Sequence, residues 1–154
     1  MIIDTHVHID CAAVYAKLAT SCHIPPVEYV EVHGETGSKE AILNFVRQST
    51  EEQEVGEWII GQGRFSLESE GNSPSRAELD AVAPDHPVMI RYSAHSQLLN
   101  SKALEITDIT REGPTQEMRD KVAPGAKIRR DPDTGEPTGV INECIDWIFP
   151  RSCP

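Results

Sequence analysis

The stretch Ile2-Ile3-Asp4-Thr5-His6-Val7-His8-Ile9-Asp10 lies near the start of the chain and decides how the fold is interpreted. Its apolar pattern is typical of a short buried strand, and it carries two histidines at positions i and i+2. Because side chains alternate between the two faces of a strand, His6 and His8 point to one face and Val7 to the other. Two imidazoles on one face can bind a single divalent metal ion, usually zinc. The stretch therefore predicts part of a metal site.

A plainer interpretation of this histidine pair stays open, in which His6 and His8 only finish a strand and form local hydrogen bonds. Two neutral ligands are fewer than the three or four protein ligands of a zinc site, so tight binding by this pair alone is not expected. Asp4 lies two residues before His6 on the same face. It is a candidate hydrogen-bond partner that orients an imidazole, and local structural hydrogen bonding is the alternative.

Length, charge and cysteine content exclude several classes of protein. The 154 residues suffice for one domain, but a complete barrel of eight strand–helix units needs roughly 200 to 250. A formal net charge of −11 disfavours binding to nucleic acid or to an anionic membrane. The sequence shows neither a signal peptide nor an apolar run near the ~20 residues that span a bilayer, so we expect a cytoplasmic protein. The four cysteines form no C-x-x-C pair and are expected to be reduced thiols.

The rest of the chain mixes helical and strand patterns without regular alternation, which is typical of the α+β class. Residues 93–99 are predicted to turn the chain, with His95 near the apex, and residues 107–124 are polar without a clear period. Strands are expected at 27–33, 57–63, 87–92, 126–130 and 138–141, and helices at 11–20, 39–53, 76–83, 101–106 and 142–149. The last two strands are expected to form a hairpin, with a turn at residues 131–135 made by Asp-Pro and Thr-Gly steps.

Local signals fix two of the predicted helix starts. Ser38 is a suitable N-cap for the helix that ends near Gln53. Its inner stripe is expected to consist of Ile42, Phe45, Val46 and Ser49. Ser75 and Glu78 have the spacing of a capping box, in which the hydroxyl and the carboxylate each accept from the other residue's backbone N–H. Gly61 and Gly63 lack the third glycine of a phosphate-binding loop, so close backbone packing is the expected reason for them.

Four segments together carry a more specific pattern. They are residues 3–8 with the H-x-H pair, residues 57–63, residues 75–88 together with His95 and 99–104, and residues 130–140. Taken together, these segments resemble the amidohydrolase superfamily, and within it amidohydrolase family 3, the imidazolonepropionase-like and exoenzyme-regulatory-like hydrolases. The resemblance covers nearly the whole chain except residues 11–26.

The resemblance implies a metal-dependent hydrolase of C–N bonds built on a TIM barrel. In such enzymes a divalent metal, usually zinc, lowers the pKa of a bound water to about 7. The resemblance makes His6 and His8 metal ligands. It also implies a lysine or glutamate bridge, two more histidines and a catalytic aspartate on later barrel strands, none of which this chain contains. We therefore expect an N-terminal fragment, inactive alone: the first barrel strand and following segment (1–26) and an inserted α+β subdomain (27–154).

Two residues of the expected insert are candidates for contact with a small-molecule substrate. His95 and Asn100 lie in the segment that resembles the centre of the inserted region. The alternative for both is a polar turn in which Ser101 caps the short helix that follows.

Two other functions stay open. The chain could be a catalytically inert folded module or a pairing subunit, which forms a homo-oligomer through its exposed first strand. It could also be a compact hydrolase that begins with Asp-x-His-x-His, although the sequence has no histidine after His95.

Overall fold

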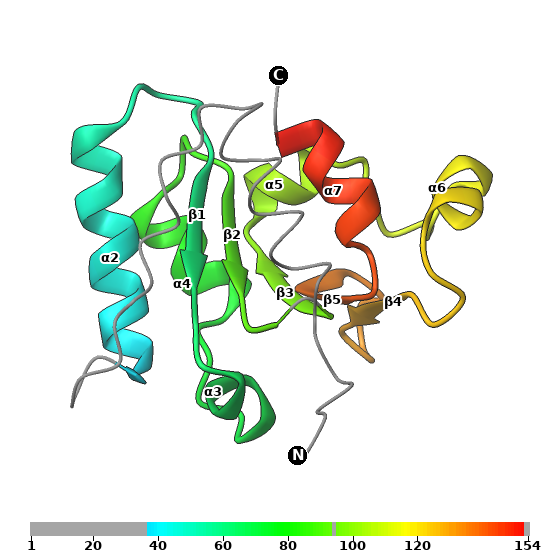
Figure 1. Cartoon of the computed structure of the whole chain (residues 1–154), viewed down its shortest axis with the longest axis horizontal. Coiled ribbons are helices and arrows are strands. Elements are labelled where there is room, and N and C mark those ends of the chain that lie inside the picture. Colours follow the sequence, from blue (N-terminus) through cyan, green and yellow to red (C-terminus); the bar gives the residue numbers. More distant parts are fainter. Residues whose placement is uncertain (1–36, 94, 153–154) are drawn as a thin grey trace, which may run out of the picture.

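The structure is a computed structural model that describes residues 37–93 and 95–152 (Figure 1). The predictions for His6, His8 and Asp4, and for the elements at 11–20 and 27–33, lie outside these residues. The described residues fold into five strands and six helices. The strands are β1 (Ile59–Gln62), β2 (Val88–Arg91), β3 (Ser96–Leu99), β4 (Lys127–Arg130) and β5 (Pro137–Asn142), and the helices are α2 (Lys39–Glu52), α3 (Phe65–Ser69), α4 (Arg76–Val82), α5 (Ser101–Ile106), α6 (Gln116–Lys121) and α7 (Ile145–Ser152).

The strands form one sheet in the order β1-β2-β3-β5-β4. Only β1 and β2 are parallel, and every other neighbouring pair is antiparallel. Helices are interspersed among the strands, so the predicted mixed α+β class is confirmed. None of the helices in the described part of the chain has the length and apolar character to cross a membrane.

The alternation of side chains along the strands divides the core into two apolar clusters, one on each face of the sheet. Ile59, Ile90 and Leu98 belong to one cluster, with residues of α2, α3 and α4. Ile60, Met89 and Leu99 belong to the other, with residues of α5, α6 and α7. Helices therefore cover both faces of the sheet, with α2 beside β1 at one edge (Figure 1).

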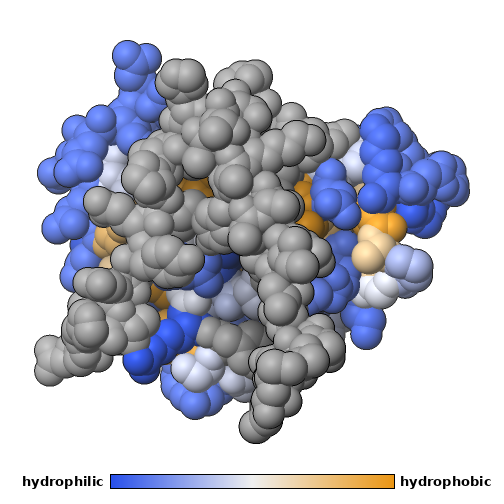
Figure 2. All heavy atoms as spheres, viewed as in Figure 1, coloured by the Kyte–Doolittle hydropathy of each residue, from blue (hydrophilic) through white to orange (hydrophobic). Residues whose placement is uncertain are grey.

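Helix α2 confirms its predicted cap and its predicted buried stripe. The Ser38 side chain accepts a hydrogen bond from the Ala41 backbone N–H, and Gln53 ends the helix. Ile42, Val46 and Ser49 recur at helical spacing and are buried, and Phe45 of the same stripe is partly buried against the core. Hydrophilic side chains cover the outer side of α2 and the region of α6 in the space-filling view (Figure 2).

The capping box of α4 is also confirmed. The Ser75 hydroxyl accepts from the Glu78 backbone N–H, and the Glu78 carboxylate accepts from the Ser75 N–H at 2.8 Å. The same carboxylate accepts from Lys39 Nζ at 2.8 Å, which joins the first turns of α4 and α2.

Gly61 in β1 and Gly63 just after it confirm the expectation of close packing. A Cβ atom on Gly61 would lie 2.8 Å from Cε1 of Phe45, and one on Gly63 would lie 2.5 Å from Cε1 of Tyr92. Both distances are too short for real carbon contacts, so the backbone itself is packed against these two rings.

One prediction for the middle of the chain is wrong, and a segment without a predicted element contains a helix. Residues 93–99 do not form one turn, because Ser96–Leu99 is the central strand β3, paired with β2 on one side and β5 on the other. Ser96 and Gln97 are polar, so the sequence pattern did not indicate a buried strand. Residues 107–124 contain the short helix α6, whose Thr115 N-cap accepts from the Met118 N–H and whose Met118 side chain enters the core.

The closing hairpin is confirmed. The turn between β4 and β5 is held by Asp131, whose Oδ1 atom accepts from the backbone N–H groups of Asp133 and Thr134 at 3.0 and 2.8 Å. This is the turn chemistry expected of Asp-Pro and Thr-Gly steps. The last predicted helix is present as α7, but it starts at Ile145 instead of 142 because β5 runs to Asn142.

Candidate functional site

Polar side chains gather at the edge of the sheet where the parallel strands end. Gln62 at the end of β1 pairs in register with Arg91 at the end of β2, and Arg91 pairs with Gln97 of β3. Arg91 and Gln97 are 4% and 0% exposed. Burying polar side chains costs free energy unless they are hydrogen-bonded, so buried polar residues are uncommon in a core. In open parallel α/β sheets, ligands bind beyond the carboxyl ends of the strands. Strands β1 and β2 are the parallel pair here, so the edge where they end is the candidate site.

His95 and Glu143 meet at this edge although 48 positions separate them in the sequence. Strands β3 and β5 pair with Ser96 opposite Asn142, which brings the residues just before β3 and just after β5 together. His95 Nδ1 lies 2.9 Å from one carboxylate oxygen of Glu143 and 3.0 Å from the other. The backbones of the two residues are also hydrogen-bonded, because the Glu143 N–H donates to the His95 carbonyl oxygen at 3.0 Å.

This contact orients the imidazole. An ionised carboxylate only accepts hydrogen bonds, so the Nδ1 atom of His95 is the donor in this contact. The side chain of His95 is 58% exposed and that of Glu143 is 36% exposed. An oriented imidazole near the surface can accept a proton, accept a hydrogen bond from a bound molecule, or bind a metal through Nε2.

Glu143 was not among the residues singled out from the sequence. Its backbone has φ +57°, a left-handed conformation that is uncommon for residues other than glycine. Residues held in such conformations cluster at functional sites. The pairing partner of His95 depends on which strands are neighbours in the sheet, and no local pattern in the sequence carries that information.

Asn100, the second predicted substrate contact, is buried and bonds within the fold. It is 0% exposed. Its Oδ1 atom accepts from the backbone N–H groups of Val88 and Ala103, and its Nδ2 atom donates to two backbone carbonyl oxygens, those of Ala83 and His86. These four bonds use the whole side-chain amide.

Asn100 is also the N-cap of α5, so the expectation that Ser101 caps this helix is wrong. Ser101 is the first helical residue, and its hydroxyl donates to Asp80 at 2.6 Å. This bond links α5 to α4. The structure therefore brings His95, and not Asn100, to the polar edge.

The predicted metal ligands cannot be placed, because His6, His8 and Asp4 lie outside the described residues. Within residues 37–93 and 95–152, no three His, Cys, Asp or Glu side chains gather as a metal site would require. His95 and Glu143 make two such groups. The described residues therefore do not form a complete zinc site by themselves.

The chain belongs to the amidohydrolase family. The model of this family, described as "Amidohydrolase family", matches residues 2–146, which include the His6-Val7-His8 motif and both His95 and Glu143. The resemblance noted in the sequence is thereby confirmed.

Three curated proteins are similar to the chain. An N-substituted formamide deformylase of Arthrobacter pascens is 30% identical over 92% of this chain and 23% of its own length. The protein LONG AFTER FAR-RED 3 of Arabidopsis thaliana is 30% identical over 97% of this chain and 22% of its own length. A putative amidohydrolase, YtcJ, of Bacillus subtilis is 31% identical over 76% of this chain and 21% of its own length.

The chain thus spans less than a quarter of the length of each of these relatives. No solved structure matches the chain.

Proposed function

We propose that this chain is part of a metal-dependent amidohydrolase that hydrolyses a C–N bond, in an amide or a cyclic amide. The observation that carries this proposal is the family match over residues 2–146. The relative named as an N-substituted formamide deformylase supports a C–N bond as the target. In this proposal, residues 1–26 hold the first barrel strand, and residues 27–154 form the α+β insert beside the barrel.

The proposal gives the metal-binding role to His6 and His8, with zinc as the metal and Asp4 as a hydrogen-bond partner of an imidazole. Zinc needs further protein ligands, which would come from later barrel strands. When bound, it would supply an activated water. In this proposal, the part of residues 37–93 and 95–152 is to position the substrate.

We assign the substrate-side role to His95, oriented by Glu143. The imidazole is exposed and aligned by a carboxylate at 2.9 Å, as expected for a group that recognises a bound molecule through Nε2. Asn100 is left out of this role, because its amide is buried and fully used by the fold.

The experiment is a hydrolysis assay with N-substituted formamides and cyclic amides. It compares the 154-residue chain with a longer protein that contains it and the later barrel strands. We expect turnover only from the longer protein, with stoichiometric zinc by elemental analysis. Replacing both His6 and His8 by alanine should remove zinc and activity together. A longer protein that binds no zinc and turns over no such substrate would support the inert module or pairing subunit instead.

The role of His95 is tested in the same longer protein. His95→Ala removes the recognising group and Glu143→Gln weakens its orienting contact, so each should lower kcat/KM by about ten- to a hundredfold while zinc content stays constant. Glu105→Gln is a matched control, since Glu105 pairs with Lys102 at 3.4 Å on α5, which follows the end of β3 opposite to His95. Unchanged kinetics in both test variants would remove His95 from the site.

A further inference from the structure

A pocket of about 430 Å³ lies between α6 and the β4–β5 hairpin. Its volume falls in the range of small-molecule sites. The apolar side chains of Met118, Val122 and Ile128 line it, and the buried thiol of Cys144 lies at its wall. Apolar surface is also visible beside the hydrophilic surface of the α6 region in the space-filling view (Figure 2).

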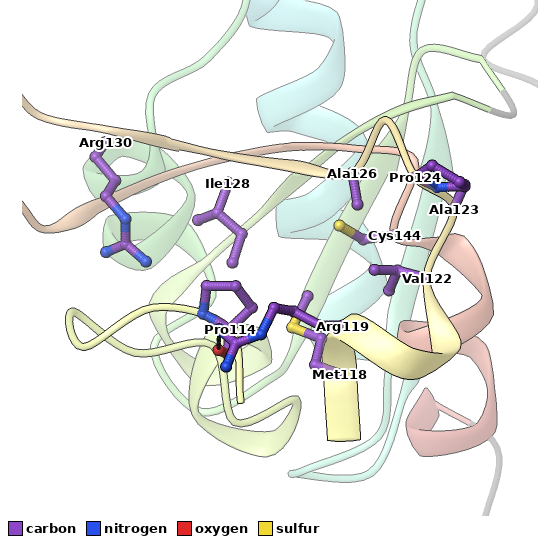
Figure 3. A pocket seen from close by; sticks show the side chains of 10 residues that line it. All are labelled: Pro114, Met118, Arg119, Val122, Ala123, Pro124, Ala126, Ile128, Arg130 and Cys144. Atoms are coloured by element: carbon purple, nitrogen blue, oxygen red, sulfur yellow. Dashed lines mark hydrogen bonds between the residues drawn. The ribbon is translucent and has the colours of Figure 1, made fainter. Parts of the chain in front are cut away.

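Two arginines line the same pocket. Figure 3 shows the guanidinium groups of Arg119 and Arg130 toward the Pro114 end, with Val122 and Cys144 toward the other end. Arg119 comes from α6, and Arg130 ends β4. The pocket therefore has an apolar part and a cationic part.

Neutral oxygens hold both guanidinium groups in place. Arg130 donates to the backbone carbonyl oxygens of Thr110, Arg111 and Gly135, each at 3.0 Å. Arg119 donates to the carbonyl oxygen of Pro114 at 2.6 Å and to the side-chain oxygen of Gln116. Three of the five N–H donors of Arg130 are used in this way, so two remain for a ligand.

Neither arginine forms an ion pair with a carboxylate in the described part of the chain. The nearby acids of α6 have other partners: Glu117 pairs with Lys121 at 2.7 Å, and Asp120 accepts from Gln116 at 2.8 Å. Arg130 acts only weakly on the carboxylate of Glu112. The pKa of Glu112 is lowered mainly by a hydrogen bond from Thr110, with smaller contributions from Arg111 and Arg130. In a chain with 25 acidic and 14 basic residues, two arginines that lack carboxylate partners beside an apolar pocket form a distinctive cationic site.

We propose that this pocket binds a small carboxylate with an apolar body, its tail against Met118, Val122 and Ile128 and its carboxylate at Arg119 and Arg130. A planar guanidinium that neutral oxygens already hold in place recognises a carboxylate at a low cost in side-chain entropy. The apolar walls add affinity through the area that they remove from water. Neither His95 nor Glu143 lines this pocket, although Cys144, the residue after Glu143, does. The proposal does not depend on the proposed hydrolase activity.

The test uses the 154-residue chain with hexanoate as the probe, measured by calorimetry and by ¹H–¹⁵N chemical shifts. Hexanamide has the same apolar body without the charge, and acetate has the charge without the body. We expect hexanoate to shift the amide signals of Met118, Val122 and Ile128. Hexanamide and acetate should each bind about tenfold more weakly, because each lacks one of the two parts of the interaction.

Two arginine variants and a control locate the carboxylate. Arg119→Gln removes an exposed charge from α6 and should weaken hexanoate binding about tenfold, the value of a charged hydrogen bond. Arg130→Gln should do the same, and its spectrum will show whether the hairpin stays folded. Arg129→Gln is the matched control, because Arg129 is next in sequence, pairs with Glu68 and does not line the pocket. It should leave hexanoate affinity unchanged.

Three results would overturn the proposal. The first is no binding of hexanoate up to about 10 mM, above which affinities are weaker than those of specific sites. The second is equal affinity for hexanoate and hexanamide, or equal loss in Arg119→Gln and Arg129→Gln. The third is a shift of the same signals with protein concentration alone, which would identify the pocket as a contact between two copies of the chain.

Discussion

The Oδ1 atom of Asn100 lies 2.9 Å from the backbone nitrogen of Val88, so one side chain fixes the start of β2 against the start of α5. The same oxygen accepts from the Ala103 N–H at 2.9 Å. The Nδ2 atom completes the set by donating to the carbonyl oxygen of His86 at 2.8 Å and to that of Ala83 at 3.3 Å. Three chain segments therefore depend on one buried amide.

Asn100→Ala should lower the free energy of unfolding by roughly 2 to 4 kcal/mol, because it removes an N-cap and leaves buried backbone groups without partners. Urea unfolding followed by circular dichroism measures this loss. Asn72→Ala is the control, since Asn72 is exposed and its side chain makes only a 3.4 Å contact with Glu70. A loss below about 1 kcal/mol for Asn100→Ala would show that water or neighbouring groups replace the amide.

Gly139 in β5 offers a second test of packing. Its φ is +94°, and a Cβ atom there would overlap the backbone carbonyl oxygen of Leu99 in β3. Gly139→Ala should therefore destabilise the fold by roughly 3 kcal/mol or more, since the backbone of a central strand has to move. The measurement is the urea midpoint.

Gly71→Ala separates the two causes. Gly71 also has a positive φ, +73°, but nothing lies within 4 Å of the position that its Cβ would occupy. Its cost should be about 1 kcal/mol, the conformational penalty alone. Equal losses in the two variants would mean that backbone conformation, and not the contact with Leu99, determines the effect at Gly139.

Local chemistry explains what the sequence predicted correctly. A cap such as Ser38, a capping box such as Ser75 and Glu78, and the turn at Asp131 are each determined by residues within four positions of one another. The apolar spacing of α2 also follows from a local period. These signals predicted the elements at both ends of the described region and the mixed α+β class.

Long-range pairing explains what the sequence did not predict. Ser96 and Gln97 have the composition of a turn, but they are buried because β3 lies between β2 and β5. The pairing of β3 with β5 also creates the contact between His95 and Glu143, which no local spacing indicates. At the start of α5, Asn100 and Ser101 are both suitable caps, and Val88, twelve residues earlier, decides between them.

The Glu78 carboxylate should titrate well below other glutamates. A hydrogen bond from Lys39, followed by hydrogen bonds from the Ser75 backbone and hydroxyl, lowers its pKa to about 2 from 4.5. Because the folded-state pKa is depressed, the stabilisation is present above pH 4.5 and is lost as the pH falls toward 2. An NMR titration of the Glu78 side-chain carbon measures this pKa.

Variants on either side of Glu78 test the cause. Lys39→Met should raise the midpoint toward the ordinary value, and Ser75→Ala should raise it less, since the Lys39 hydrogen bond is the largest cause. Lys102→Met is the control, because Lys102 pairs with Glu105 at 3.4 Å and should leave the Glu78 titration unchanged. A midpoint near 4.5 in the unmodified chain would contradict the contact between α2 and α4.

The fold should also lose stability in alkali, through Tyr92. Burial raises the pKa of this phenol to about 12, against a smaller opposing effect of the hydrogen bond with Ser73. Because the unfolded phenol ionises near pH 10, Tyr92 contributes its full stabilisation below that pH and loses it as the pH rises toward 12, by on the order of 2 kcal/mol. Urea midpoints between pH 8 and about 11 measure the loss, and Tyr92→Phe should flatten that dependence. A phenolate absorbance step for Tyr92 near pH 10 in the folded chain would mean that water reaches the ring, and the packing of Tyr92 against Gly63 would then be wrong.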